Sequence, residues 1–324
     1  GDITEVIGKV WYNSGSNVWK VGVEAPGSWS AAPTLNEARS SAGYSGTSNT
    51  SAMIFGGNED YPFSLPGKTE QYNGTSWTEV SAQVVARMNT GGQGTATASL
   101  CFGGSSFTGG VPGLTRQASN EEWNGTSWTE KANLSQALNN NAAAGGPATP
   151  TAALCIGGNP EPQGQTTRIW DGSSWTDSAS LNAGVASGMG CGTSTAALCI
   201  GGSPTPRANE TEIWNGTSWT VTADSGNNRT SGGASGTSTA ALQFGGYDSN
   251  LSPPTNTVNV EKWNGTSWTE VANLGQSATT TGGCSISSTA TMKIGGYSGP
   301  PEIYYNFTEE WQDPVIGAKT ITTS

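Results

Sequence analysis

The chain has 324 residues, a net charge of −11 and no histidine. The lack of His excludes a Ser-His-Asp triad, a Cys-His pair and His-ligated zinc or copper. The 13 Lys and Arg residues are scattered, which argues against a nucleic-acid partner, and the apolar runs are too short for membrane insertion. Thirteen Trp residues nevertheless indicate a folded chain rather than a disordered one.

The N-terminal segment, residues 1–26, predicts a β-hairpin. Its sequence GKVWYNSGSNVWKVGV alternates apolar and polar residues on both sides of residues 13–17, where Asn, Ser and Gly favour a turn. We expect this hairpin to lie outside the main domain.

An internal repeat dominates the rest of the chain. Six Gly-Gly pairs recur at nearly regular intervals, each after a short apolar run such as AMIFGG or ALCIGG. The pairs begin at Gly56, Gly103, Gly157, Gly201, Gly245 and Gly295. Each pair is followed by an aromatic residue, namely Tyr72, Trp123, Trp170, Trp214, Trp263 and Trp311.

Five of these aromatics open a second short motif, WNGTSW or a close variant. Its second aromatic is Trp77, Trp128, Trp175, Trp219 or Trp268. Asn-Gly and Asp-Gly accept the positive φ of a tight hairpin turn, so each motif predicts two strands joined by such a turn. Together with a small-residue strand and the apolar strand before Gly-Gly, each repeat predicts a four-stranded unit.

The sixth unit lacks its second aromatic after Trp311. Trp29, however, precedes Gly56 by 27 residues, within the 26 to 29 residues that separate the second aromatic from the next Gly-Gly pair in the other five units. We therefore predict that an N-terminal strand around Trp29 completes the unit formed by residues 282–311. Residues 27–313 then form a closed ring, and residues 314–324 form a further strand that pairs with the N-terminal hairpin as a stalk.

The Gly-Gly pairs, the paired aromatics and an Arg ten residues after the second Trp resemble a kelch-type β-propeller. The Arg is present as Arg39, Arg87 and Arg229, whereas Leu138, Val185 and Ala278 replace it in the other units. The resemblance implies an all-β, six-bladed propeller of four-stranded blades, but it implies no particular function. The hairpin VWYNSGSN-VWKV is similar to segments of bacteriophage tail-fibre and other virion proteins.

The connections after each Gly-Gly pair differ in length, and we predict that they form a partner-binding rim. Function is commonly carried by variable loops on a rigid frame, and exposed aromatics suit sugar faces or protein partners. The alternative is that these side chains only clamp the loops onto the propeller. The candidate ligand-binding residues are Tyr61, Phe63, Phe107, Arg116, Arg207, Tyr247 and Tyr297.

The repeated residues favour structural roles. We expect the Trp pairs to pack between blades rather than to bind sugars, and the three Arg residues to bond backbone carbonyls rather than a ligand anion. Cys191 and Cys199 allow either a disulfide across a hairpin or two free buried thiols, and the repeated position favours free thiols. We expect no metal, because Glu59, Asp60 and Asp248 match no calcium loop.

These features predict a non-enzymatic structural or attachment protein on a virion surface or in the extracellular space, such as an adhesin. Its partners would be other virion or surface proteins, bound through residues 1–26 and 314–324, and a host glycan or receptor at the rim. The alternative is a secreted glycan-binding lectin. We expect no catalytic residues and no cofactor, since kelch-like oxidases need His on copper and residues 171–175 only superficially resemble a sialidase turn.

Overall fold

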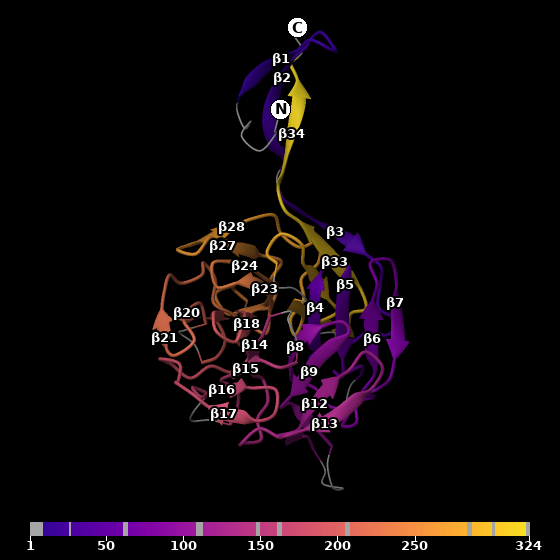
Figure 1. Ribbon diagram of the computed structural model, residues 1–324, viewed down its shortest axis with the longest axis vertical. Coiled ribbons are helices and arrows are strands. Elements are labelled where there is room, and N and C mark those ends of the chain that lie inside the picture. Colours follow the sequence, from indigo (N-terminus) through magenta and orange to yellow (C-terminus); the bar gives the residue numbers. More distant parts are fainter. Residues whose placement is uncertain are drawn as a thin grey trace.

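The computed structural model describes residues 9–25, 27–60, 64–107, 113–146, 150–160, 164–204, 208–253, 255–283, 287–299 and 302–321. Over these residues the regular elements are all β-strands, as predicted, and no helix long and apolar enough to cross a membrane occurs among them. Figure 1 shows a ring of small sheets, seen face on, with a narrow sheet projecting from its edge.

The ring consists of six four-stranded antiparallel blades. From the innermost to the outermost strand, the blades are β4 (Gly43–Ser48), β5 (Ser51–Phe55), β6 (Thr69–Tyr72) and β7 (Trp77–Val80); β8 (Gly91–Thr95), β9 (Ala98–Phe102), β12 (Asn120–Trp123) and β13 (Trp128–Lys131); β14 (Ala142–Ala144), β15 (Ala153–Ile156), β16 (Thr167–Trp170) and β17 (Trp175–Asp177); β18 (Met189–Gly192), β19 (Ala197–Ile200), β20 (Thr211–Trp214) and β21 (Trp219–Val221); β23 (Gly233–Thr237), β24 (Ala240–Phe244), β27 (Val260–Trp263) and β28 (Trp268–Glu270); and β29 (Gly282–Gly283), β30 (Met292–Ile294), β33 (Thr308–Gln312) and β3 (Ser28–Ala32). The six innermost strands contact one another in cyclic order.

The sixth blade joins the two ends of the chain. Its outer strand β3 pairs antiparallel with β33, and Trp29 lies opposite Trp311. In the second blade Trp123 lies opposite Trp128 in the same way. Trp29 therefore occupies the position of the missing second aromatic, and the predicted closure by an N-terminal strand is confirmed.

A ring of backbone hydrogen bonds joins the six blades just before their innermost strands begin. Just before each innermost strand, a residue other than glycine adopts a φ between 49° and 57°. Each of these residues donates its N–H to the carbonyl of its counterpart in the preceding blade, over 2.6 to 3.1 Å. The six are Ser41, Asn89, Asn140, Ser187, Ser231 and Thr280, and the N–H of Ser41 closes the circle on the carbonyl of Thr280. The unfavourable φ is tolerated because neighbouring blades hold it in place.

The Trp pairs form the core between blades, as predicted. The first Trp of each pair is completely or almost completely buried. The second reaches the preceding blade: the ring centroid of Trp128 lies 4.9 Å from that of Phe55, and its indole N–H donates to the Thr69 hydroxyl. Aromatic contacts of this kind stabilise beyond their buried area, so each blade is held to its neighbour.

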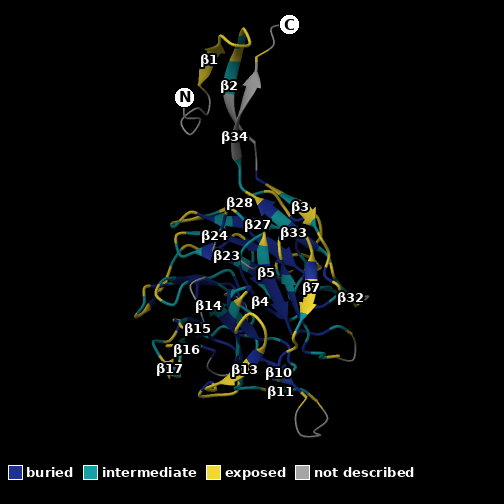
Figure 2. Ribbon diagram, turned by 45° about the vertical axis from the view of Figure 1, so that its right-hand side comes forward, coloured by how far each residue is buried: buried dark blue, intermediate teal, exposed yellow. Residues whose placement is uncertain are grey.

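The stalk is a three-stranded sheet of β1 (Val10–Asn13), β2 (Val18–Ala25) and β34 (Val315–Thr320), in the order β1-β2-β34. It confirms both the hairpin and its pairing with the C-terminal strand. The stalk leaves the sixth blade between β33 and β3, where the other five blades have a tight turn. Figure 2 shows that buried residues fill the propeller whereas β1 is exposed.

Candidate functional site

The variable connections lie together on one face of the ring. Strands within a blade alternate in direction, so the connections from second to third strand share a face with those from the outer strand to the next blade. The tight turns lie on the opposite face. Three variable connections carry ladders of their own: β10 (Ser105–Ser106) with β11 (Thr115–Arg116), β22 (Arg229–Thr230) with β25 (Tyr247–Asp248) and β26 (Thr255–Asn256), and β31 (Tyr297–Ser298) with β32 (Ile303–Tyr304). These three connections therefore have regular secondary structure of their own.

The predicted rim residues fall into two groups. Phe107 and Arg116 belong to the second blade; the Phe107 side chain is 50% exposed and Arg116 is also exposed. Tyr247 and Tyr297 belong to the adjacent fifth and sixth blades, across the ring from the second. Tyr61, Phe63 and Arg207 lie outside the described residues.

The two tyrosines differ in their surroundings. Tyr247 is 41% exposed, whereas Tyr297 is half-buried and stacks on Tyr304 with ring centroids 5.4 Å apart. The side-chain amide of Asn256 donates to the Tyr297 carbonyl over 2.9 Å and ties the fifth-blade connection to the sixth. Tyr247 is thus exposed enough to contact a partner. Tyr297 also helps to hold two connections together, which is the structural role considered as the alternative to binding.

The three arginines are buried and not open to a ligand. Arg39, Arg87 and Arg229 each place Nη2 2.6 Å from a glutamate oxygen, of Glu70, Glu121 and Glu261 respectively. Their Nη1 atoms donate to two backbone carbonyls each, which confirms the predicted carbonyl bonds. Burial lowers the pKa of Arg229, and the charge of Glu261 opposes that shift.

The glutamate partners of these arginines were not predicted from the sequence, although a signal for them is present there. A Glu stands two residues before the first aromatic in five of the six blades, at Glu70, Glu121, Glu212, Glu261 and Glu309. A carboxylate repeated in the middle of a buried strand requires a cation or several donors. Its recurrence beside a recurrent Arg was sufficient to predict the pair.

In two of the blades without this arginine, another cationic side chain is buried instead. In the third blade Arg168 replaces the glutamate itself and donates to Ser135 and Gln136. In the sixth, the second strand provides Lys293, whose Nζ lies 3.5 Å from the ring centroid of Phe307. Burial lowers the pKa of Lys293 to about 7, and the charge of Glu309 counteracts part of that effect.

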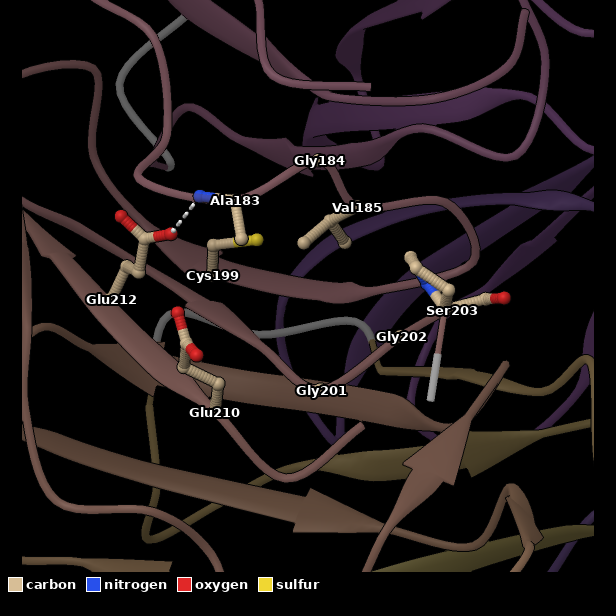
Figure 3. A pocket seen from close by; sticks show the side chains of 10 residues that line it. Ala183, Gly184, Val185, Cys199, Gly201, Gly202, Ser203, Glu210 and Glu212 are labelled. Atoms are coloured by element: carbon tan, nitrogen blue, oxygen red, sulfur yellow. Dashed lines mark hydrogen bonds between the residues drawn. The ribbon is translucent and has the colours of Figure 1, made fainter. Parts of the chain in front are cut away.

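The fourth blade has Val185 at the arginine position and a hollow beside it. The hollow is small, about 10 Å³, which is room for about one water molecule. Figure 3 shows the side chains of Val185, Cys199, Glu210 and Glu212 around it. Glu212 is 3% exposed and accepts hydrogen bonds from the backbone N–H groups of Asn182 and Ala183 and from the Asn182 side chain.

The described cysteines are unreactive core residues. Cys101, Cys155, Cys191 and Cys199 are free and buried. Cys191 lies opposite Leu198 and Cys199 opposite Gly190, so the two do not face each other across the hairpin, and the interpretation as free thiols is confirmed. Burial raises the pKa of the Cys101 thiol to about 11, which keeps it protonated and unreactive.

Within the described ranges, no group of three metal-ligating side chains occurs. Asp248, considered above as a calcium ligand, is buried and accepts hydrogen bonds from the Asn227 side chain and the Asn250 backbone. Its carboxylate therefore orders the loop.

Comparison with known protein families and with curated proteins finds no match to this chain.

Proposed function

We propose that this protein is a non-enzymatic structural or attachment component of a virion or cell surface. In this proposal the stalk docks onto the assembly and the propeller presents its variable face to a protein or glycan partner. We include in this proposal that the blades are of the kelch type and that the stalk hairpin is related to segments of phage tail fibres.

The exposed side chains of the stalk are the observation that carries this proposal. Val10, Tyr12 and Trp19 are each at least half exposed, and the Tyr12 and Trp19 rings pair with centroids 5.4 Å apart. Val10 and Tyr12 alternate along β1 and so share one face, on which Trp19 is the cross-strand partner of Tyr12. Exposed apolar patches of this kind mark interaction sites. The stalk thus offers a face for another protein, away from the ring.

The test is to locate the chain by mass spectrometry on purified particles or cell surfaces of its source. We expect the intact protein on the assembly, and a Tyr12→Ser, Trp19→Ser double variant to be lost from it while its propeller melts normally. A matched control is Thr129→Ser on the outer strand of the second blade. Recovery of the intact protein only as free chain in the culture fluid would contradict the proposal.

The alternative, a secreted glycan-binding lectin, is favoured by the exposed aromatics Phe107 and Tyr247 on the variable face. Aromatic rings stack on the apolar faces of sugars. A glycan array decides the matter: specific hits that disappear in Tyr247→Ala would support the lectin, and an array without hits would remove it.

A further inference from the structure

We propose that the mouth of the central channel, on the variable face of the ring, binds the uncharged sugar residue at the end of a glycan chain. The mouth consists of the six positive-φ residues that precede the innermost strands, namely Ser41, Asn89, Asn140, Ser187, Ser231 and Thr280. The proposal rests on the proposed function only in that the variable face meets the partner.

The centre of the ring is hollow. Each innermost strand pairs on one side only, so the backbone groups of its other edge face the axis (Figure 1). A hollow of about 140 Å³ lies there, lined by residues of these strands such as Gln93, Ala143 and Gly233. A second hollow of about 90 Å³ shares part of that lining and includes all six mouth residues. The two form one passage that opens at the variable face and has room for several water molecules.

The walls of this passage are polar but carry no charge. Among the described residues that line the two hollows there is no Asp, Glu, Lys or Arg. An ionic ligand would therefore lose its hydration without gaining a counter-charge, whereas a neutral ligand rich in hydroxyl groups would not. Asn141 Oδ1 and Thr280 Oγ1 belong to lining residues, are shielded from solvent and have no hydrogen-bond partner in the described part of the chain. These atoms are available to the hydroxyl groups of a ligand.

The mouth keeps polar side chains where glycine would be less strained. The chain has glycine at 24 described positions of positive φ, and six of the seven such positions with another residue form the mouth. For the β-branched Thr280, a φ of 49° is a clear outlier. All six residues are Ser, Thr or Asn, whose side chains both donate and accept hydrogen bonds. Because strained residues cluster at ligand sites, this ring of polar groups indicates a ligand at the axis.

Aromatic side chains lie beside one part of the mouth. In every blade the residue after Gly-Gly is the cross-strand partner of the residue that precedes the mouth residue. In the fifth and sixth blades this partner is Tyr247 or Tyr297, whereas in the other four it is Asn58, Ser105, Asn159 or Ser203. Tyr247 is 41% exposed, so its ring can cover the apolar face of a sugar whose hydroxyl groups bond to the mouth. A sugar matches this combination better than a peptide does, because it offers hydroxyl groups around an apolar face.

The experiment titrates the intact protein with the methyl glycosides of glucose, galactose and mannose, each beside its uronic acid counterpart, and follows NMR shifts of the Ser231 and Thr280 amides. We expect at least one neutral glycoside to bind with a dissociation constant on the order of 1 mM. Its charged counterpart should bind at least tenfold more weakly, since the walls offer no counter-charge. The absence of shifts with every neutral glycoside would show that the mouth holds water only and would overturn the proposal, as would equal binding of the charged counterpart.

Glycine variants locate the site. The double variant Ser187→Gly, Ser231→Gly removes two mouth hydroxyl groups, and glycine adopts a positive φ without strain. It should melt no lower than the parent and bind the glycoside at least tenfold more weakly. The matched control is Asn17→Gly, which makes the same kind of change in the stalk turn, where φ is 53°, and should leave binding unaltered. Full binding by the double variant would overturn the proposal.

Aromatic variants separate the mouth from the rest of the rim. Tyr247→Ala should weaken glycoside binding, whereas Phe107→Ala, at the exposed aromatic of the second blade, should not. Binding that is lost in Tyr247→Ala but kept in the double glycine variant would place the sugar on the rim alone and overturn the axial site.

Two further arms identify the partner. Acetyl-Gly-Gly-amide offers peptide groups without a sugar, so binding as tight as that of the best glycoside would assign the mouth to a protein and overturn the proposal. On a glycan array, the same sugar should be bound at chain ends, and equal binding at internal positions would contradict recognition of an end. The particle-location test is independent: a protein that is found on particles but binds none of these glycosides loses this site and keeps its proposed function.

Discussion

The fourth and sixth blades both depart from the common pattern, but at different levels. The fourth is continuous in sequence, and the described residues that donate to its Glu212 do so through neutral amides instead of an arginine. The sixth is assembled from the two ends of the chain, with β3 beside β33, and carries its cation on another strand as Lys293. Both keep four strands and the paired aromatics. The frame therefore depends on strand pairing and Trp packing, and the buried charge is a separable addition.

Removal of the closing strand should have the largest effect. Deletion of residues 1–32 removes β3 and leaves the hydrogen-bonding edge of β33 and the ring of Trp311 uncovered. We expect loss of the cooperative melt by circular dichroism, and aggregation on size exclusion. Deletion of residues 1–26, which keeps β3, is the control and should remain monomeric. A 1–32 deletion that melts as sharply as the parent would contradict closure by β3.

The second-largest effect is expected when the buried arginine is removed from a blade that has one. Arg87→Val converts the second blade into the residue set of the fourth, with Cys101 and Glu121 matching Cys199 and Glu212. Because it leaves Glu121 buried without its partner, we expect a loss of about 3 to 5 kcal/mol in the free energy of unfolding by urea.

The double variant Arg87→Val, Glu121→Gln is the control, because it removes the buried charge together with its partner and should recover part of the lost stability. If Arg87→Val is as stable as the parent, the buried pair does not have the assigned role.

The sixth blade predicts a dependence on pH. Burial lowers the pKa of Lys293 to about 7, below the value in the unfolded chain. Above pH 7 the unfolded chain therefore binds more protons than the folded protein, so the free energy of unfolding should rise with pH. Below pH 7 the lysine is protonated in both states, and the full cost of burying its charge lowers the stability. Between pH 7 and 8.5 we expect a rise of about 1 to 2 kcal/mol in the free energy of unfolding.

Lys293→Gln, which copies Gln243 of the fifth blade, should flatten this rise. Lys131→Gln, at an exposed position of the second blade, is the control and should leave it intact. An unchanged slope in Lys293→Gln would assign the pH dependence to other groups.

The smallest effect is expected in the fourth blade. Val185→Arg places a guanidinium beside Glu212, as in the first blade, and should raise the free energy of unfolding by about 1 kcal/mol, since the gain from pairing is offset by removing a guanidinium from water. Val185→Leu adds apolar volume without charge and should not reproduce the gain. A marked loss of stability in Val185→Arg would show that the acceptors are not arranged as in the first blade.

The ring was predictable because its signals repeat. Each Gly-Gly pair requires positive φ; at Gly56 and Gly57 the values are 62° and 93°, and an added Cβ would meet the backbone carbonyls of Arg87 and Ser40. The spacing to Trp29 then identified the strand that closes the ring. The rim was less predictable, because residues such as Tyr247 and Tyr297 have the same character but different neighbours, and neighbours from other blades decide which of them is exposed.

The sequence by itself determined the number of blades, their strand order and the origin of the last strand, because these follow from local turns and from a repeat that a single chain displays. Only the tertiary structure decided which repeated side chains meet. Glu70 and Arg39 are far apart in the sequence, and neither residue alone indicates that the two form a buried ion pair. For the same reason, only the structure shows that Glu212 accepts hydrogen bonds from Asn182 and Ala183, whereas Glu70 also binds an arginine, since partners are a property of three-dimensional contacts.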